Sequence, residues 1–189
     1  MPQLNLPVYD IKIKEENGQR KIFDILRRKY LVITPEEWVR QHFIHYLIEH
    51  KNYPMGLLAN EISLSIGEKV IRADSVLYDK CLRPRMIIEY KAPHIQLTQK
   101  VFDQISAYNL LLHVDYLIVS NGIDTYICKM DYEHQTYTFL SSIPDYKELY
   151  LRFFHYSTPI LVHKTTKKSI QPKRKHKPDA GILPYKISS

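Results

Sequence analysis

The sequence predicts one α/β domain in which helices flank a mixed central sheet. Its 189 residues are enough for one domain with a hydrophobic core, and 44% hydrophobic with 25% charged residues is a globular composition. Strand-like and helix-like segments follow one another in the order α, β, β, β, α, β, β, β, α, without an internal repeat. Basic residues gather near the C-terminus. We therefore expect the domain to cover residues 1–160 and a basic, flexible tail to cover residues 161–189.

The first clear element is a helix that begins after Thr34. Residues 1–33, which precede it, mix short apolar stretches with charge and predict no firm element. Thr34 suits the N-cap position, Pro35 suits the first helical position, and Glu37 completes the pattern of a capping box. Apolar residues at helical spacing extend the helix to about residue 50.

Three strand-like segments follow the helix. They cover residues 61–66, 70–78 and 86–91, and they combine alternating apolar positions with residues of high β-propensity. Residues 81–84 form a turn-like segment between the second and the third, which predicts antiparallel pairing of these two strands. Pro93 ends the third segment.

The second half of the chain repeats the mixture of helix and strand. A helix is predicted over about residues 97–112, strands over residues 115–120, 126–130 and 137–140, and a last helix over about residues 145–154. The segment after the second helix, residues 115–120, has the sequence Asp-Tyr-Leu-Ile-Val-Ser, whose apolar centre is typical of a buried strand.

The composition excludes several classes of protein. The 5 glycines are too far apart for a Walker A loop or a dinucleotide-binding fingerprint. No apolar run approaches the roughly 18 residues of a membrane span, and no secretory signal is visible. The two cysteines, Cys81 and Cys128, are distant in sequence, which favours reduced thiols. We therefore expect a cytoplasmic protein without membrane association.

The net charge of +7 belongs to the tail. Residues 161–189 contain eight Lys or Arg against one acidic residue, whereas residues 1–160 are neutral. A cluster in this tail could attract phosphates through counterion release, or it could only aid solubility. Both interpretations remain open for the cluster, which consists of Lys173, Arg174, Lys175 and Lys177.

Charged residues interrupt two of the strand-like segments. Asp74 lies in the middle of residues 70–78, while Glu89 and Lys91 lie at the end of residues 86–91. Because strand side chains alternate, Glu89 and Lys91 share a face, and a hairpin could place Asp74 beside Glu89. Two carboxylates can bind a hard divalent cation, and a lysine whose pKa is lowered by burial could orient or deprotonate a water. A water activated in this way could attack a phosphodiester. The alternative, a structural salt bridge between Lys91 and Glu89 or Asp74, stays open.

The surrounding motifs resemble those of the PD-(D/E)XK nuclease superfamily. They are, in chain order, Arg72-Ala73-Asp74, Glu89-Tyr90-Lys91-Ala92-Pro93 and Gln104-Ile105-Ser106-Ala107-Tyr108-Asn109. Over residues 26–130 the chain is similar to the N-terminal nuclease domain of type I restriction enzyme R subunits, and residues 34–43 and 116–122 also look typical. The resemblance implies a restriction-endonuclease-like core, αβββαβ, with a mixed central sheet flanked by helices. Ala73 stands where the superfamily motif has proline.

The resemblance also implies roles for the matching residues. Asp74 and Glu89 would bind Mg²⁺ or Mn²⁺, with the backbone carbonyl of Tyr90 as a further ligand. Lys91 would position the attacking water or stabilise the transition state.

Four further residues receive less specific roles. Gln104 and Tyr108 match a Q-x-x-x-Y motif and would contact the active-site lysine or the DNA backbone. Glu37 is the candidate for the acidic ligand that family members place on the first helix, although it could equally be the capping-box partner of Thr34. Arg72 could contact a phosphate or serve as a charge partner.

These observations predict a metal-dependent DNA endonuclease that hydrolyses phosphodiester bonds with a metal-activated water. One alternative is a catalytically silent nucleic-acid-binding module. Another is a subunit of a larger restriction or repair assembly, with a helicase or methyltransferase subunit as partner, and a homodimer is also open. With 189 residues the chain is too short for the helicase motor of an R subunit, so we do not expect it to translocate DNA by itself.

Overall fold

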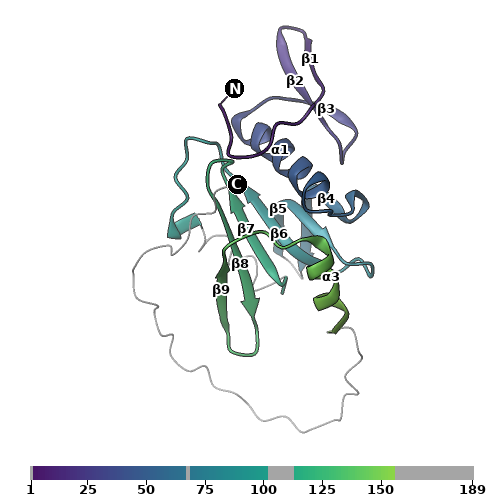
Figure 1. The fold of residues 1–189 in the computed structure, drawn as a ribbon. Coiled ribbons are helices and arrows are strands. Elements are labelled where there is room, and N and C mark those ends of the chain that lie inside the picture. The colour runs from purple at the N-terminus through teal and green to yellow at the C-terminus, as the bar shows by residue number, and fades with distance from the viewer. Residues whose placement is uncertain (1, 67–68, 102–112, 156–189) are drawn as a thin grey trace.

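The computed structural model describes residues 2–66, 69–101 and 113–155, which form two β-sheets with helices packed against them (Figure 1). A small three-stranded sheet lies at the N-terminal end, and a six-stranded sheet forms the centre. Helix α1 (Pro35–Glu49) lies between the two sheets and contacts both. The predicted α/β fold with a mixed central sheet is therefore confirmed.

The N-terminal sheet is the element that the sequence pattern did not predict. Its strands are β1 (Ile13–Glu16), β2 (Gln19–Asp24) and β3 (Lys29–Val32), all antiparallel. Asn17 and Gly18 join β1 to β2 with φ angles of 56° and 72°. An Asn-Gly pair is the preferred two-residue loop of a hairpin, because both positions need positive φ. That pair is the signal that could have revealed the sheet.

Helix α1 begins as the sequence predicts. The Thr34 hydroxyl oxygen accepts a hydrogen bond from the Glu37 backbone N–H at 3.0 Å, which satisfies one of the unpaired donors at the helix start. The helix is buried on more than one side, because the central sheet lies against one face and β2 against another. Val39, Phe43 and Leu47 belong to the core between α1 and the central sheet.

The central sheet has the strand order β4-β5-β6-β7-β8-β9. Its strands are β4 (Leu58–Ile66), β5 (Lys69–Tyr78), β6 (Pro84–Tyr90), β7 (Tyr116–Ser120), β8 (Thr125–Asp131) and β9 (Thr136–Leu140). Neighbouring strands are antiparallel except for β6 and β7, which are parallel. The predicted antiparallel hairpin of β5 and β6 is confirmed. The parallel pair makes the sheet mixed and requires a long connection between its two strands.

Several boundaries differ from the sequence-based ones. Strand β4 begins at Leu58 rather than at residue 61, and β6 ends at Tyr90, so Lys91 lies just beyond the strand. Of the helix predicted over residues 97–112, residues 99–101 are helical and residues 102–112 lie outside the described residues. The predicted tail also lies outside them. The remaining elements are a 3-10 helix, η1 (Met55–Leu57), and the helix α3 (Tyr146–His155).

The central sheet is buried on both faces. On one face, Met86, Ile88 and Ile118 pack in the core that includes α1. On the other face, Ile87 and Leu117 belong to a second buried cluster, as strand alternation requires. Among the described residues, no helix has the length and apolar character needed to cross a membrane.

Candidate active site

Asp74 lies in β5 next to the end of β6. Ser75 pairs with Ile88, and one position further along this register Asp74 comes beside Glu89. One carboxylate oxygen of Asp74, Oδ2, accepts a hydrogen bond from the Tyr90 backbone N–H at 2.8 Å. The structure therefore fixes the Asp74 carboxylate at the last residues of β6.

Glu89 and Lys91 form an ion pair at the same place. The Lys91 Nζ atom lies 2.8 Å from Glu89 Oε1. The Lys91 backbone N–H donates to the Ser120 carbonyl oxygen at 2.9 Å, so the parallel strand β7 fixes the backbone at Lys91. The exposed fractions of the Asp74, Glu89 and Lys91 side chains are 26%, 15% and 21%, so the group is partly shielded and still reaches solvent.

Burial and neighbouring charges shift the pKa values of both Glu89 and Lys91. Burial raises the pKa of Glu89, and the negative charge of Asp74 raises it further, although the hydrogen bond from Lys91 opposes them. Burial by itself would lower the pKa of Lys91, but the hydrogen bond to Glu89 and the charges of Glu89, Asp74 and Glu36 outweigh it. The pKa of Lys91 is therefore raised. The prediction of a lowered pKa at Lys91 is therefore wrong, because the carboxylates around the ammonium outweigh the effect of burial.

Arg40, which the sequence analysis did not single out, connects Asp74 to two other carboxylates. Its Nη2 atom lies 3.1 Å from Asp74 Oδ1, and its Nη1 atom lies 2.6 Å from Glu37 Oε2 and 3.1 Å from Glu61 Oε1. The Arg40 side chain is only 7% exposed, and its guanidinium carbon lies 5.7 Å from the centre of the Tyr90 ring. The spacing of Glu37 and Arg40, three positions apart on a helix, is the signal that could have indicated this residue.

Glu61 is a second residue that the sequence analysis missed. It lies in β4 between two residues that pair with β5, at the position facing Asp74, and it has a φ of 51°. A positive φ is unusual for a residue other than glycine and often marks a functional or constrained position. The Glu61 carboxylate also forms an ion pair with Arg27, which in turn lies 2.6 Å from Asp24 through its Nε atom.

Glu37 is connected to Asp74 and Glu61 through the shared guanidinium of Arg40. Besides its contact with Arg40, its carboxylate accepts a hydrogen bond from Gln41 at 2.7 Å and lies 3.5 Å from Arg27. The Glu37 carboxylate, which was predicted as an acidic metal ligand, is thus in contact with two arginines and the Gln41 amide. The described residues contain no group of three or more His, Cys, Asp or Glu placed to hold a metal ion.

The other predicted residues are placed as follows. Arg72 is exposed on β5, two positions before Asp74 and hence on the same side of the strand. Gln104 and Tyr108 lie outside the described residues, as do Lys173, Arg174, Lys175 and Lys177.

The donor set of Asp74 and Glu89 fits a hard divalent cation. Both groups offer carboxylate oxygens, which are the ligands that Mg²⁺ prefers. Their mutual repulsion contributes to the raised pKa of Glu89, and a bound cation between them would relieve that repulsion. The Tyr90 backbone carbonyl belongs to the same segment of chain.

The α/β domain thus brings two carboxylates and a lysine together on the adjacent strands β5 and β6 and the residue that follows β6. The family model described as the type I restriction enzyme R protein N terminus (HSDR_N) matches residues 35–144. The chain belongs to this family. The matched region contains Asp74, Glu89 and Lys91 and begins after the N-terminal sheet.

Two solved structures are similar at low identity. One is the fragment structure of a protein assigned as an HsdR subunit of a type I restriction enzyme from Vibrio vulnificus YJ016, with 18% identity and a TM-score of 0.48 over 65% of this chain and 26% of that chain. The other is a cryoEM structure of a DrdV–DNA complex, with 17% identity and a TM-score of 0.41 over 67% of this chain and 12% of that chain. This chain therefore spans about a quarter or less of either protein. No curated protein matches it.

Proposed function

We propose that this chain is a metal-dependent DNA endonuclease domain that hydrolyses phosphodiester bonds. The observation that carries the proposal is the convergence of Asp74, in the middle of β5, with Glu89 and Lys91 at the end of the neighbouring strand β6, within reach of solvent. Membership of the restriction enzyme R N-terminal family supports the same class of activity.

Asp74 and Glu89 would hold Mg²⁺ or Mn²⁺, with the Tyr90 carbonyl as a further ligand. A bound cation would supply an activated water and would polarise the phosphoryl oxygens. The Tyr90 N–H and the Arg40 guanidinium orient the Asp74 carboxylate, so one of the two acidic groups is fixed before metal binds.

Lys91 would act as a cation in this reaction. Its ammonium, which lies 2.8 Å from Glu89 Oε1 at the site, could stabilise the negative charge that develops on the phosphoryl oxygens. In the reaction a bond forms between the water oxygen and phosphorus while the bond from phosphorus to the leaving sugar oxygen breaks. The attacking water releases one proton to solvent, and the leaving sugar oxygen takes one proton up from solvent, so that the protons balance.

The chain would perform this reaction within a restriction system. A helicase or methyltransferase subunit is the proposed class of partner, and membership of the type I restriction enzyme R N-terminal family supports it. DNA is the proposed substrate, and a homodimer remains a further proposal.

A cleavage assay tests the proposed activity. The purified full chain, with Mg²⁺ or Mn²⁺, is incubated with duplex, single-stranded, branched and modified DNA. We expect cleavage of at least one form by the wild type and its loss in Asp74→Ala and Lys91→Ala. Asp131→Ala and Lys129→Ala, which remove the same types of side chain from β8, should cleave as the wild type does.

Metal binding provides the second readout. Asp74→Ala should lose affinity for Mn²⁺ measured by calorimetry, whereas Asp131→Ala should keep it. Absence of cleavage on every DNA form, or equal cleavage by the wild type and Lys91→Ala, would overturn the proposed function.

A further inference from the structure

The outer face of the N-terminal sheet combines lysines with aromatic rings. Lys14 pairs with Lys21 across β1 and β2, and Phe23 pairs with Tyr30 across β2 and β3. Because side chains alternate along a strand, these four lie on one face together with Lys12. We call this surface the lysine-aromatic face; it consists of Lys12, Lys14, Lys21, Phe23 and Tyr30.

The aromatic rings hold two of the lysines in place. The Lys14 Nζ atom lies 4.5 Å from the centre of the Tyr30 ring, and the Lys12 Nζ atom lies 6.0 Å from the centre of the Phe23 ring. The two rings are 5.2 Å apart in an edge-to-face arrangement. Cation–π contacts of this kind attract an ammonium group to the face of an aromatic ring.

One carboxylate faces these lysines. Glu16 forms ion pairs with Lys14, at 2.7 Å, and with Lys21. Both lysines therefore share a single, 43% exposed counter-charge, and the face keeps a net positive charge. The other side of the sheet is different, since Ile22 is fully buried there.

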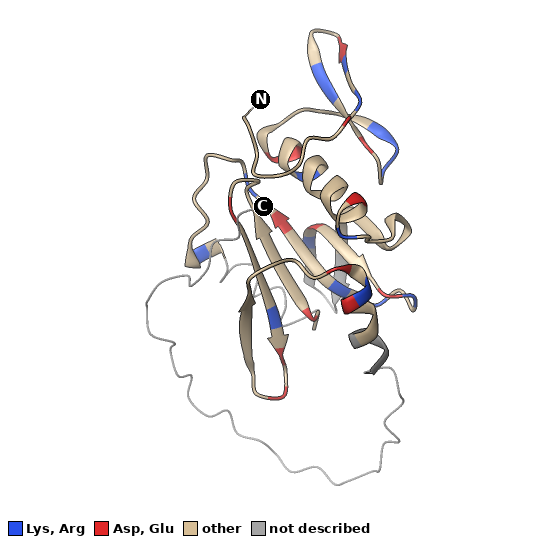
Figure 2. Cartoon of the chain, viewed as in Figure 1, with Lys and Arg blue, Asp and Glu red and all other residues tan. Residues whose placement is uncertain are grey.

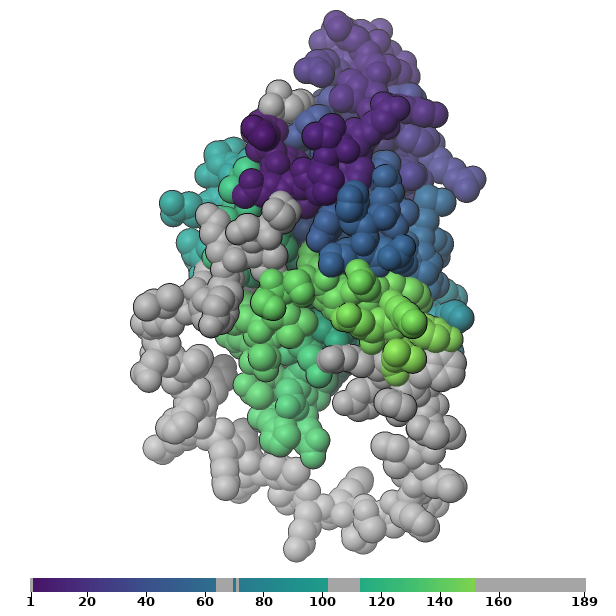
Figure 3. All heavy atoms as spheres, viewed as in Figure 1, coloured from purple at the N-terminus to yellow at the C-terminus, as the bar shows by residue number. Residues whose placement is uncertain are grey.

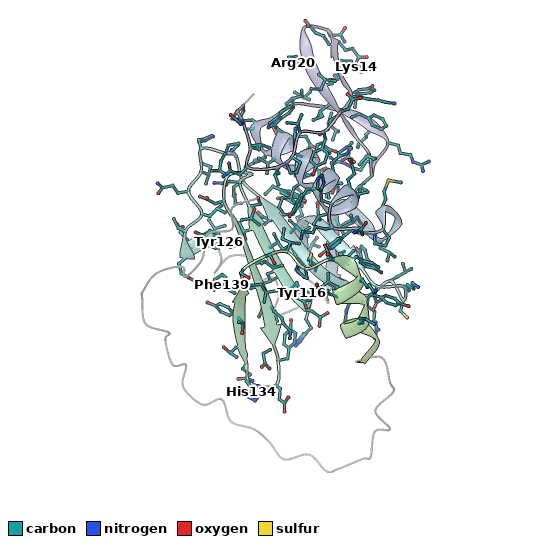
Figure 4. The ribbon with its side chains drawn as sticks, in the orientation of Figure 1. Lys14, Arg20, Tyr116, Tyr126, His134 and Phe139 are labelled. Carbon is teal, nitrogen blue, oxygen red and sulfur yellow. The ribbon has the colours of Figure 1, made fainter. Side chains whose placement is uncertain are left out.

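This positive charge is local. Residues 12–32 contain seven Lys or Arg and three Asp or Glu, whereas the rest of residues 1–160 contains twelve Lys or Arg and sixteen Asp or Glu. Figure 2 shows Lys and Arg on β2 and β3, and Figure 3 shows that this sheet projects at one end of the molecule. Lys14 and Arg20 lie near the end of the projection (Figure 4).

The sheet is attached to the candidate active site. Arg27, in the connection between β2 and β3, forms ion pairs with Asp24 in β2 and with Glu61 in β4. Arg40 continues this chain of contacts from Glu61 to Asp74. The buried side of the N-terminal sheet is therefore joined to the elements that carry the candidate active site, and the lysine-aromatic face lies on the other side of the same sheet.

We propose that the lysine-aromatic face binds the phosphate backbone of the DNA on which the candidate active site acts. The ligand follows from charge complementarity, because closely spaced ammonium groups on a projecting sheet suit a regular row of phosphates. The inference rests on the proposed function for the identity of the nucleic acid. It assigns a binding role to a sheet that lies outside the matched residues 35–144.

DNA affinity in the absence of metal tests this inference. Binding of the full chain to a fluorescent duplex and to a single strand of the same sequence is measured in EDTA at several salt concentrations. The variant Lys12→Gln/Lys14→Gln/Lys21→Gln should bind duplex DNA about tenfold more weakly at low salt, and its log–log salt slope should fall by about 0.9 for each phosphate that the variant no longer neutralises. The control Lys80→Gln/Lys129→Gln/Lys147→Gln removes the same charge from the β5–β6 turn, β8 and α3 and should bind nearly as the wild type does.

A second variant makes the lysine-aromatic face more positively charged. Glu16→Gln removes the counter-charge of Lys14 and Lys21 and should tighten DNA binding several-fold, a gain that an unfolded protein cannot produce. Equal weakening by both triple variants, or no change in any variant, would overturn the inference. Binding is measured without metal, so it does not depend on cleavage. A failure of the proposed DNA-binding face can therefore be distinguished from a failure of the proposed nuclease activity.

Discussion

At the scale of single residues, the buried Arg40 guanidinium contacts carboxylates from three elements: Glu37 in α1, Glu61 in β4 and Asp74 in β5. A buried cation of this kind compensates charges that would otherwise be costly to remove from water. It also orients one oxygen of Asp74, while the Tyr90 N–H orients the other. Arg40 is therefore a positioning residue for the proposed metal site.

Replacing Arg40 should destabilise the fold strongly. In Arg40→Gln, three carboxylates lose their shared cation, and we expect the free energy of unfolding to fall by about 3–5 kcal/mol. Urea denaturation measures this change. Arg83→Gln is the matched control, because its partner Asp79 is buried but Arg83 itself is 48% exposed, and we expect a loss below about 1 kcal/mol. Equal losses in the two variants would contradict this role of Arg40.

Asp24 should make stability depend on pH. Its fully buried carboxylate accepts hydrogen bonds from the backbone N–H groups of Leu26 and Arg27, from the Arg27 side chain and from Asn60. Burial would raise the pKa of Asp24, but these hydrogen bonds and the charge of Arg27 lower it below 3.8. The ionised form is therefore favoured in the folded state, and its contribution is present above that ordinary value and lost as the pH falls through the folded pKa.

The test compares the wild type with Asp24→Asn by urea denaturation between pH 7 and pH 3. We expect the wild type to be more stable at pH 7 and the difference to shrink as the pH falls below about 4. A difference that stays constant over this range would show that the Asp24 charge does not contribute to folding.

At the scale of elements, the connection between β7 and β8 fixes the N-terminal segment. Gly122 has a φ of 80°, and its carbonyl oxygen accepts a hydrogen bond from the Asn5 backbone N–H at 2.7 Å. A Cβ atom at Gly122 would lie 2.8 Å from a methyl carbon of Leu4 and 3.2 Å from one of Val39. The glycine therefore lets the N-terminal segment and α1 approach this turn.

Gly122→Ala should be more destabilising than Gly18→Ala. Both glycines have positive φ, but a Cβ atom at Gly18 would meet no atom within 4 Å. We expect Gly18→Ala to lower the free energy of unfolding by about 1 kcal/mol from backbone strain alone. Gly122→Ala should lower it by about 1–3 kcal/mol more, because neighbouring side chains must move. Thermal unfolding of both variants measures the difference, and indistinguishable transitions would contradict close packing at Gly122.

The elements also show where local sequence signals are sufficient. The cap at Thr34 and the β5–β6 hairpin follow from neighbouring residues, so they were predicted. The strands of the N-terminal sheet are short and highly charged, and their pattern is weak until the Asn17-Gly18 loop is recognised. Pairing across that loop, rather than the propensity of any strand, makes the sheet.

At the scale of the whole molecule, charge is divided among regions. Residues 1–160 are neutral as a whole, yet the N-terminal sheet is basic and the remainder is acidic. The net charge summed over residues 1–160 does not show this difference between regions. The difference becomes clear only when residues 12–32 are assigned to one projecting sheet. The proposed DNA-binding face depends on that arrangement.

The sequence by itself determined the α/β class, the start of α1 and the alternation that places Glu89 and Lys91 on one side of β6. These features depend on residues close together in the chain, whose periodicity and capping act locally. Only the tertiary structure decided that Arg40 and Glu61 join Asp74 and that Lys91 keeps a raised pKa. The physical reason is that a charge responds to the groups around it in space, and packing brings those groups together from α1, β4, β5 and β6.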